Sequence, residues 1–456
     1  MKRRDFLMAS GGVAGALLPA WANAQAQPCP PPAVAVSGGT SATSSCGNDA
    51  PEVRSGTVTL VGSNTMYDLV AANPSRLAGW PTYAFGYATG GAYGSGTYVP
   101  GYGAKGAYVV CMSSGDSAPQ ISDAAIFDFD TLAWTLQVNA DGVPNSLGTT
   151  WCTNVTGRSP STDGAPYYEM SGKPGVPHPA QLYRLAVGIG TRFIRPLTCY
   201  AGGDIKTAPY AHQYDLATAR YSRISDDATA ALGYYNWAAE PAALYDARAN
   251  RIWILVEEMA SVNHLAYLDL TSNTWKSSPT YATPPTTGAT ANWQHSLLHD
   301  DGQRRCILTF KSTQYQGGTY PNYARVLDLD NIAAGWRNVT LSGPTTQFQY
   351  PGAGPYTESH SVRWAQYPVD NCHYTFDGFG TQISKITPPA SGITGTWTIS
   401  VISPASGTLP VQMQGGGAAE GTAAYLSHYT RFFYVPPLGA FAWVAGGTRK
   451  VALWKP

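Results

Sequence analysis

The chain has 456 residues with 28 basic and 28 acidic side chains, and only 12% of its residues are charged. An average globular protein carries roughly 25% charged residues. Such a weakly charged, neutral chain lacks the basic patches that provide most of the affinity for nucleic acid, which excludes nucleic acid as a partner. The 49 Gly and 34 Pro residues, together with 29 Tyr and 13 Trp, combine turn formers with aromatics. This composition favours many short strands.

Residues 1–24 have the pattern of an export signal, with a basic start, a short apolar run and small residues at Ala22 and Ala24. The stretch Arg3-Arg4-Asp5-Phe6-Leu7 resembles a twin-arginine signal. That resemblance implies a bacterial protein that is exported in the folded state, with a periplasmic or secreted location. No later run of about 18 apolar residues follows, so the sequence predicts no membrane span.

Residues 25–55 are rich in Pro, Gly, Ser and Thr and predict a linker, which leaves residues 56–456 as the folded domain. Export permits disulfides, and Cys29 and Cys46 can staple the linker. Four further cysteines occupy similar strand positions and are either disulfide partners or buried small apolar residues: Cys111, Cys199, Cys306 and Cys372. No cysteine spacing typical of a structural zinc site occurs.

A repeated pattern of Asp, a short turn and an aromatic residue runs through the domain. Its copies are Phe127-Asp128 with Trp134, Tyr214-Asp215 with Tyr221, Leu268-Asp269 with Trp275, and Leu327-Asp328 with Trp336. We expect the Asp side chain to accept hydrogen bonds from turn amides and the aromatic residue to start the returning strand. The pattern therefore predicts a series of β-hairpins.

Double glycines at Gly202-Gly203 and Gly446-Gly447 follow apolar strands. With the Asp and aromatic pattern, they resemble a degenerate kelch motif of the galactose-oxidase type, which implies an all-β, kelch-like β-propeller. Six blades are expected, with first strands near residues 96, 180, 242, 296, 361 and 429. The sixth blade has three strands, so the stretch Gly56 to Gly62 is expected to supply its fourth strand and close the ring. The alternative is a seventh blade within residues 65–95 or 139–177.

One position just before the first strands carries a polar residue in five blades: His178, Glu240, His295, His360 and His428. In a propeller the first strands line the central channel, so these side chains are expected to ring one mouth. Two interpretations remain open. Each residue can bind backbone or channel water, or the group can converge on a metal, an anion or a sugar.

Other candidate binding residues lie close by in the sequence. Aromatic rings suited to stacking on sugars are Trp237, Trp293, Tyr356 and Tyr425, although ordinary packing explains them equally well. Arg363 and Arg431 each follow a ring histidine by three residues and can bind a carboxylate. The long connections 65–94 and 139–177 are expected to reach the same face.

Three enzyme classes were compared with these residues. Galactose-oxidase relatives use a Tyr-His dipeptide for copper, and this chain has none, which argues against a copper oxidase. A propeller lyase would use a divalent metal held by His178, His295, His360 and His428, a resemblance of architecture only. Motifs of nucleophilic hydrolases and nucleotide sites are absent from the sequence.

The sequence therefore predicts an exported, monomeric propeller that binds a carbohydrate-like or peptide ligand through the histidine-ringed mouth. The first alternative is a metal-assisted, polysaccharide-active enzyme such as a lyase. The second alternative is a structural protein of the cell envelope.

Overall fold

The structure is a computed structural model of the chain. It describes the following residues: 52–74, 96–111, 123–142, 169–170, 173–177, 186–196, 198–199, 207–208, 211–225, 242–256, 264–277, 295–310, 314–315, 318–319, 324–344, 364–376, 382–410, 431–446 and 449–456. The chain divides into two units, Met1–Asn48 and Asp49–Pro456, and every described residue belongs to the second. The predicted export signal and nearly all of the predicted linker lie outside the described residues.

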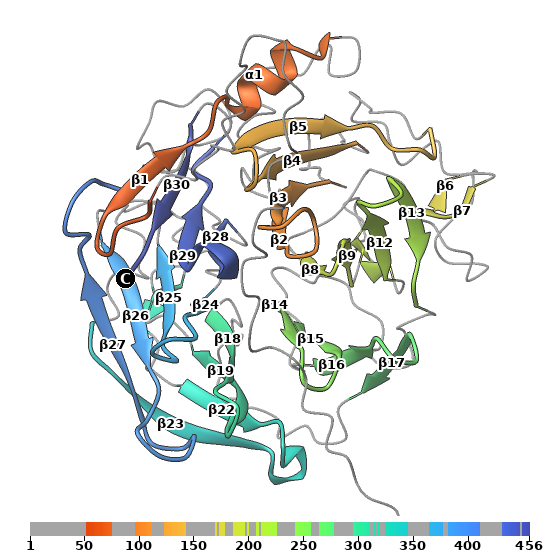
Figure 1. Cartoon of the computed structure of the whole chain (residues 1–456). Helices are drawn as coiled ribbons and strands as arrows, with labels where there is room; N and C mark the ends of the chain where they lie inside the picture. Colours follow the sequence, from red (N-terminus) through yellow and green to blue (C-terminus); the bar gives the residue numbers. More distant parts are fainter. Residues whose placement is uncertain are drawn as a thin grey trace, which may run out of the picture. The chain divides into compact units, whose positions relative to one another are not determined.

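Within the second unit, the described strands form six four-stranded antiparallel modules (Figure 1). Module 1 contains β2 (Gly96–Val99), β3 (Ala107–Val110), β4 (Ala124–Asp128) and β5 (Ala133–Gln137). Module 2 contains β8 (Val187–Ile189), β9 (Arg192–Arg195), β12 (His212–Asp215) and β13 (Arg220–Arg223). Module 3 contains β14 (Ala242–Asp246), β15 (Arg251–Val256), β16 (His264–Asp269) and β17 (Thr274–Ser277).

The remaining modules continue the same pattern. Module 4 contains β18 (His295–Asp300), β19 (Arg305–Phe310), β22 (Ala324–Asp328) and β23 (Trp336–Ser342). Module 5 contains β24 (Ala365–Gln366), β25 (His373–Phe376), β26 (Ile383–Thr387) and β27 (Thr396–Ile402). Module 6 contains β28 (Phe432–Val435), β29 (Ala440–Trp443), β30 (Val451–Trp454) and β1 (Val58–Val61). Parallel pairing of β23 with β27 joins modules 4 and 5 into one eight-stranded sheet, a contact that the sequence did not predict.

Three two-stranded ladders and three short helices complete the described secondary structure. The ladders are β6 (Glu169–Met170) with β7 (Lys173–Pro177), β10 (Thr198–Cys199) with β11 (Thr207–Ala208), and β20 (Gln314–Tyr315) with β21 (Gly318–Thr319). The helices are α1 (Met66–Ala71) and the 3-10 turns η1 (Ile332–Ala334) and η3 (Pro436–Leu438). In the described parts of 65–95 and 139–177, where a seventh blade was considered, α1 and the ladder of β6 with β7 are found instead of a four-stranded sheet. No described helix has the length and apolarity needed to span a membrane.

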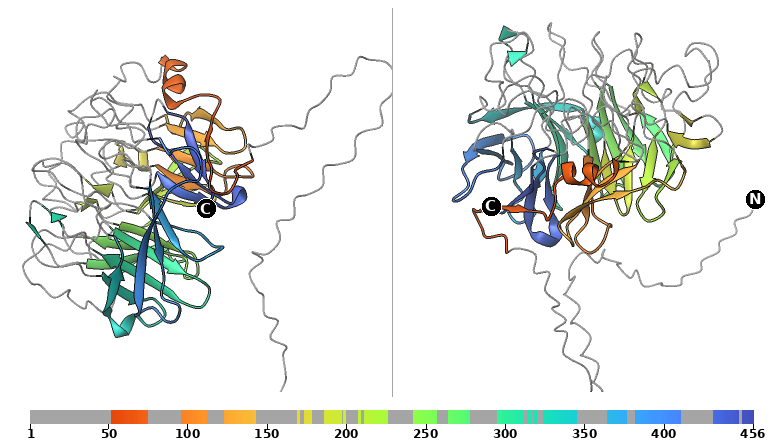
Figure 2. Two further views of the ribbon diagram at one scale, coloured as in Figure 1. Left: turned by 90° about the vertical axis from the view of Figure 1, so that its left-hand side faces the viewer. Right: turned by 90° about the horizontal axis from the view of Figure 1, so that it is seen from above.

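The first described strand completes the last module, as the sequence predicted. β1 pairs with β30 in antiparallel register, Val58 opposite Trp454 and Val61 opposite Val451. Figure 2 shows this N-terminal strand beside the C-terminal strands. The pairing joins residues from the two ends of the domain and covers an edge of β30 that would otherwise lack a partner.

The predicted Asp turns are confirmed. Turn amides donate to the carboxylates of Asp128, Asp215, Asp269 and Asp328 over 2.8–3.1 Å. The aromatic residues stand directly across the hairpins, with Trp134 opposite Phe127, Tyr221 opposite Tyr214, Trp275 opposite Leu268 and Trp336 opposite Leu327. The sequence pattern therefore marks the hairpin between the third and fourth strands of modules 1 to 4.

The buried core consists of six clusters, each between two modules. Successive modules share a cluster from module 1 to module 6, and one more cluster joins module 6 to module 1. β3 shows how a strand contributes to two of them, because its side chains alternate between faces. Tyr108 and Val110 pack toward module 6, whereas Ala107 and Val109 pack toward module 2. The fold is therefore an all-β, propeller-like arrangement of packed sheets.

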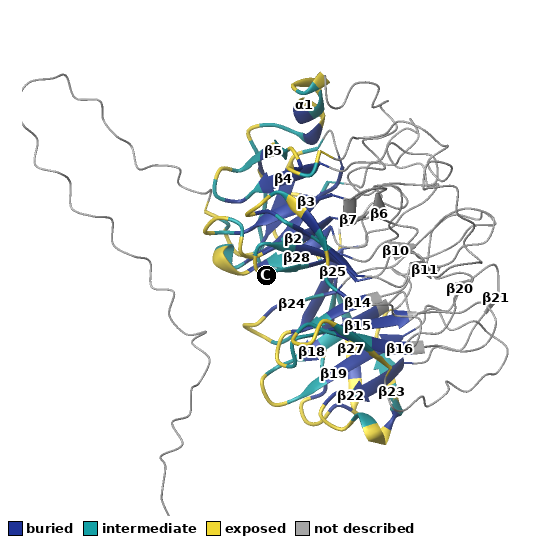
Figure 3. Cartoon of the chain, turned by 90° about the vertical axis from the view of Figure 1, so that its right-hand side faces the viewer, coloured by how far each residue is buried: buried dark blue, intermediate teal, exposed yellow. Residues whose placement is uncertain are grey.

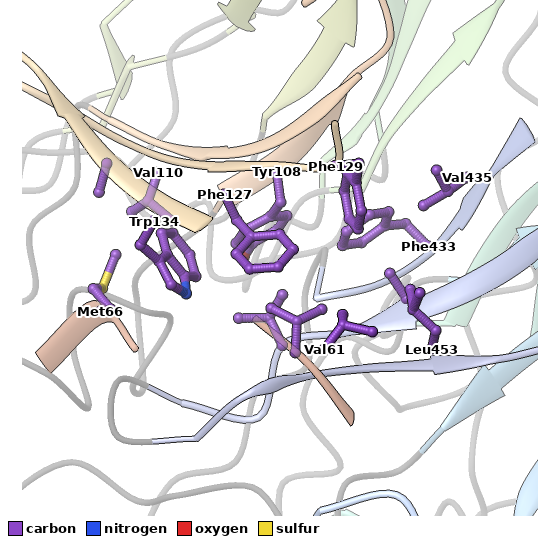
Figure 4. Packing of buried hydrophobic residues seen from close by; sticks show 14 of the residues in the cluster. Val61, Met66, Tyr108, Val110, Phe127, Phe129, Trp134, Phe433, Val435 and Leu453 are labelled. Atoms are coloured by element: carbon purple, nitrogen blue, oxygen red, sulfur yellow. The ribbon is translucent and has the colours of Figure 1, made fainter. Parts of the chain in front are cut away.

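The cluster between modules 6 and 1 is rich in aromatic rings (Figure 4). Phe433 of β28 stacks on Tyr108 of β3, with ring centroids 5.1 Å apart and planes 6° from parallel. Helix α1 contributes Met66 and Leu69 to this cluster, and its N-terminus is capped reciprocally by Thr65 and Asp68. The start of the predicted 65–94 connection is thus a helix packed against this cluster.

The described cysteines are buried free thiols, which confirms the apolar interpretation for three of the four strand positions. Cys111 and Cys306 are completely buried and Cys372 nearly so. Burial raises the pKa of the Cys306 thiol to about 12 and that of Cys111 further. The side chains of Cys29, Cys46 and Cys199 lie outside the described residues.

Candidate functional site

The two ends of the modules are built differently. Turns between first and second strands, and between third and fourth strands, lie at one end, here called the turn end. The segments that lead from one module to the next begin and end at the opposite end, here called the connection end. This follows from the antiparallel order of the strands in every module.

Short turns join the strands at the turn end. They range from two residues, 190–191, to eight residues, 388–395. In Figure 3, exposed residues of the described chain lie mainly in such turns, whereas the strands are mostly buried. Short turns leave little backbone free to move or to wrap around a ligand.

Long segments join the modules at the connection end. They are 138–186, 224–241, 278–294, 343–364 and 403–431 between successive modules, and 62–95 from β1 to β2. Even the shortest has 17 residues and the longest has 49. A module about 15 Å wide needs only about five extended residues to cross. The segments thus carry much more chain than the topology requires, which is typical of functional loops.

Two of the long segments of the connection end carry almost no charge. Segment 278–294 contains no charged side chain, and segment 403–431 contains only Glu420 and Arg431. By contrast, Asp ends the strands β4, β12, β14, β16, β18 and β22 at the turn end. Arg stands directly opposite several of these, with Arg192 and Arg220 flanking Asp215. Opposite charges at paired positions stabilise a sheet.

An ion-pair network at the turn end links modules 3 and 4. Arg305 Nη1 lies 3.2 Å from the buried carboxylate of Asp246, and Arg305 Nη2 lies 2.7 Å from Asp330. Arg248 contacts both Asp300 and Asp330. Asp246 also accepts a hydrogen bond of 3.4 Å from Trp253 Nε1. The turn end is therefore internally neutralised and cross-linked.

Most of the predicted binding residues lie outside the described residues. These are His178, Glu240, His360, His428, Trp237, Trp293, Tyr356, Tyr425 and Arg363. His295 is the first residue of β18, and its backbone stands opposite Phe310. The first strands of these modules, β8, β14, β18, β24 and β28, all begin at the connection end. His295 lies within β18 instead of before it, and β8 begins nine residues after His178.

Arg431 is the one predicted binding residue whose side chain is described. It is 1% exposed, and its Nη1 donates a 3.3 Å hydrogen bond to the backbone oxygen of Ala445 in the same module. This contact secures the chain just beyond the end of β29. Arg431 therefore has a structural role, while its predicted role in ligand binding stays a prediction.

A second buried guanidinium at the connection end was missed by sequence reasoning. Arg195, the last residue of β9, is completely buried, and its Nη2 donates to the backbone oxygen of Cys111 in module 1 over 3.2 Å. It therefore ties module 2 to module 1. An Arg at the end of an apolar strand is the only sequence signal for it.

No metal centre is found in the described part of the chain near this end. No three His, Cys, Asp or Glu side chains among the described residues are grouped to hold a metal ion. His212 starts β12 at this end and is buried, and burial together with nearby Arg223 lowers the pKa of its imidazole to about 3. His212 is therefore neutral in the folded protein.

Comparisons with known proteins give distant similarities. No protein-family model and no curated protein matches the chain. Among solved structures, hydrazine synthase from Kuenenia stuttgartiensis is 11% identical, with 64% of this chain and 63% of that chain covered and a TM-score of 0.28. An α-L-arabinofuranosidase from Lactobacillus brevis is 8% identical, with 73% of this chain and 97% of that chain covered and a TM-score of 0.33. The GH43 protein BlXynB from Bacillus licheniformis is 8% identical, with 77% of this chain and 66% of that chain covered and a TM-score of 0.35. The chain therefore spans less than two thirds of the length of BlXynB and of the hydrazine synthase.

Proposed function

We propose that the protein is a ligand-binding module that recognises a carbohydrate-like ligand at the connection end. The observation that carries this proposal is the contrast between the ends. Segments of 17 to 49 residues leave one end, whereas turns of two to eight residues close the other. Chain that the topology does not need is concentrated at one face, and binding surfaces are commonly built from such loops on a rigid scaffold.

The composition of segment 278–294 supports an uncharged ligand. Segment 278–294 combines Tyr281 and Trp293 with Ser, Thr, Asn and Gln and has no charge. Aromatic rings offer a flat apolar face, and small polar side chains offer hydrogen bonds, which together suit a sugar. An acidic polysaccharide or peptide would be expected to face more Lys and Arg.

We propose further that the six modules are the six blades of a kelch-like propeller, closed by β1. The six clusters that link each module to the next, and module 6 to module 1, support this count. In such a ring the residues just before the first strands face the mouth. The proposed contact residues are His178, Glu240, His295, His360 and His428, with Trp237, Trp293, Tyr356 and Tyr425 around them.

Export is part of the same proposal. Residues 1–24 would direct the folded protein through the twin-arginine route, and residues 25–55 would space the domain from any attachment. The three described thiols are buried and free, which suits a protein that folds in a reducing compartment before export.

The test is a titration of the exported protein with soluble neutral polysaccharides, with polygalacturonate and with a mixed peptide library. We expect a neutral polysaccharide to bind and the double variant Trp237→Ala, Trp293→Ala to weaken it at least fivefold. The control is Arg248→Ala at the turn end, which should leave binding unchanged. Preference for polygalacturonate or for peptide would contradict the proposal that the ligand is a neutral carbohydrate. Loss of binding in the control alone would contradict the assignment of the face.

A further inference from the structure

A chain of buried polar groups lies between modules 4 and 5. His299 of β18 and His373 of β25 are 0% and 1% exposed, and His299 Nδ1 lies 3.1 Å from His373 Nε2. His299 Nε2 lies 3.4 Å from Asp301 Oδ2 in the turn after β18. The order is therefore Asp301, His299, His373, from the turn into the buried space between the modules.

Asp301 is held in its ionised form. Burial opposes ionisation, but the backbone amides of Arg304 and Gln303 donate to its Oδ1 and the Arg304 guanidinium contacts its Oδ2 at 2.6 and 2.7 Å. These contacts together hold the pKa of the carboxyl well below its usual range. The charge of Asp301 is thus already balanced by Arg304.

The ionised carboxylate sets the positions of the protons on both rings. His299 Nε2 lies 3.4 Å from this carboxylate without an aligned hydrogen bond, and the nearby negative charge favours the tautomer with the proton on Nε2. His299 Nδ1 is then an acceptor, and His373 Nε2 must donate to it. His373 Nδ1 consequently has a bare lone pair, and it has no hydrogen-bond partner among the described residues. Both rings are neutral in this arrangement.

Other contacts cross the same boundary. Arg304 Nη1 donates to the backbone oxygens of Pro389 and Gly392 in module 5 over 2.6 and 2.8 Å. Gln366 of β24 exchanges two hydrogen bonds with the backbone of Asp300 in module 4. The indole of Trp397 stands edge-on to His299 at 5.6 Å. The boundary between modules 4 and 5 is therefore held by polar groups as well as by its apolar cluster.

We propose that the boundary between modules 4 and 5 is an acid-sensitive latch, closed while His299 and His373 are neutral and loosened when the pair is protonated. A proton on His373 Nδ1 would leave a charged ring buried without a hydrogen-bond partner for that proton among the described residues. A further proton on His299 Nδ1 would place two like charges 3.1 Å apart. The nearby charged groups are Asp300, Asp301 and Arg304 around His299, and Asp370 near His373.

The expected direction with pH follows from the buried state. Burial is the main cause that lowers the pKa of both imidazoles below the ordinary value near 6.5. The unlatched form binds protons that the latched form does not. The latch is therefore intact above about pH 6.5. Below that pH, the ratio of latched to unlatched protein falls by up to tenfold per pH unit for each histidine that becomes protonated.

Hydrogen–deuterium exchange on the full chain at pH 7.5 and pH 5.5, corrected for intrinsic rates, tests the latch. We expect β18 and β25 to lose at least tenfold in protection at the lower pH, with β3 and β29 at the boundary of modules 6 and 1 unchanged. The loss of protection should disappear in the double variant His299→Gln, His373→Gln. It should persist in His212→Gln, the matched control in module 2. Equal loss at both boundaries would overturn the proposal.

Nitrogen-15 spectra of the imidazole rings provide a second readout that needs no variant to fold. At pH 7.5 both His299 and His373 should carry their proton on Nε2. A proton on Nδ1 of either ring would contradict the proposed series of contacts from Asp301 through His299 to His373, and with it the latch.

Discussion

The turn end and the connection end are made by the same strands and yet have opposite properties. At the turn end, Asp residues close the strands, Arg residues stand opposite them and Arg305 joins two modules through Asp246 and Asp330. At the connection end, Arg195 donates a hydrogen bond to the backbone oxygen of Cys111 and so secures the end of β3. Because one end fixes the scaffold, the other can vary in length and chemistry without loss of the fold. Stability and binding should therefore be separable by mutation.

The largest difference between the effects on stability and on binding is expected from Arg305→Ala. It leaves the carboxylate of Asp246, which is 1% exposed on its side chain, without its guanidinium partner. Breaking a buried pair in this way costs about 3–5 kcal/mol. The free energy of unfolding measured in urea should fall by this amount, while binding of neutral polysaccharide by the folded variant stays unchanged. Asp330→Ala is the matched control, because Asp330 is 47% exposed and its loss should cost below about 1 kcal/mol.

Acid should weaken the carboxylate contacts of the turn end. For Asp269, partial burial is outweighed by hydrogen bonds from Ser272 and Thr271 and by Lys276 and Arg251, which lower the pKa of the carboxyl. A carboxyl whose folded pKa is lowered stabilises the protein above its ordinary value of about 4, and this contribution is lost as pH falls.

Urea midpoints between pH 5 and pH 2 measure this effect. The slope should become shallower in Asp301→Asn, because the pKa of Asp301 is lowered strongly in the folded protein. An unchanged slope would show that the carboxylates of the turn end are not responsible. The double variant His299→Gln, His373→Gln removes the titration of the latch and so separates the two effects.

Substitutions at the connection end should weaken binding without lowering stability. Each of Trp237→Ala and Trp293→Ala should weaken binding by about 0.5–1.5 kcal/mol, the value of an aromatic contact beyond its buried area. Their urea midpoints should match that of the unmodified protein. A large loss of stability would assign these rings to the packing between modules, the alternative that the sequence left open.

The smallest effect concerns the thiols. Cys111 and Cys306 should not react with Ellman's reagent in the folded protein, since both are fully buried and their thiol pKa values are raised by burial. Both should react after unfolding in guanidinium chloride. Rapid reaction without denaturant would show that the boundaries between modules open readily.

The sequence predicted what short-range patterns determine. Asp128 and Trp134 are six residues apart and define their hairpin, and the missing strand of the last module pointed to Gly56 to Gly62. Contacts between distant residues left no such pattern. The 3.1 Å contact of His299 with His373, and the parallel pairing of β23 with β27, depend on how modules 4 and 5 pack.

The candidate site was less accessible to sequence reasoning than the fold. Arg431 was selected as a carboxylate ligand from its spacing to His428, yet the described contact is with the backbone of Ala445. Arg195 was not selected, although it is equally buried at the same end. Spacing places a residue along a strand, but which neighbour its side chain reaches depends on the packing of adjacent modules.

The central claim is that the connection end binds the ligand, and hydrogen–deuterium exchange with and without saturating neutral polysaccharide tests it most directly. We predict protection in the segments 224–241, 278–294, 343–364 and 403–431, with the turns 247–250, 301–304 and 436–439 unchanged. Protection confined to those turns, or none in any segment while binding is measured, would contradict the claim.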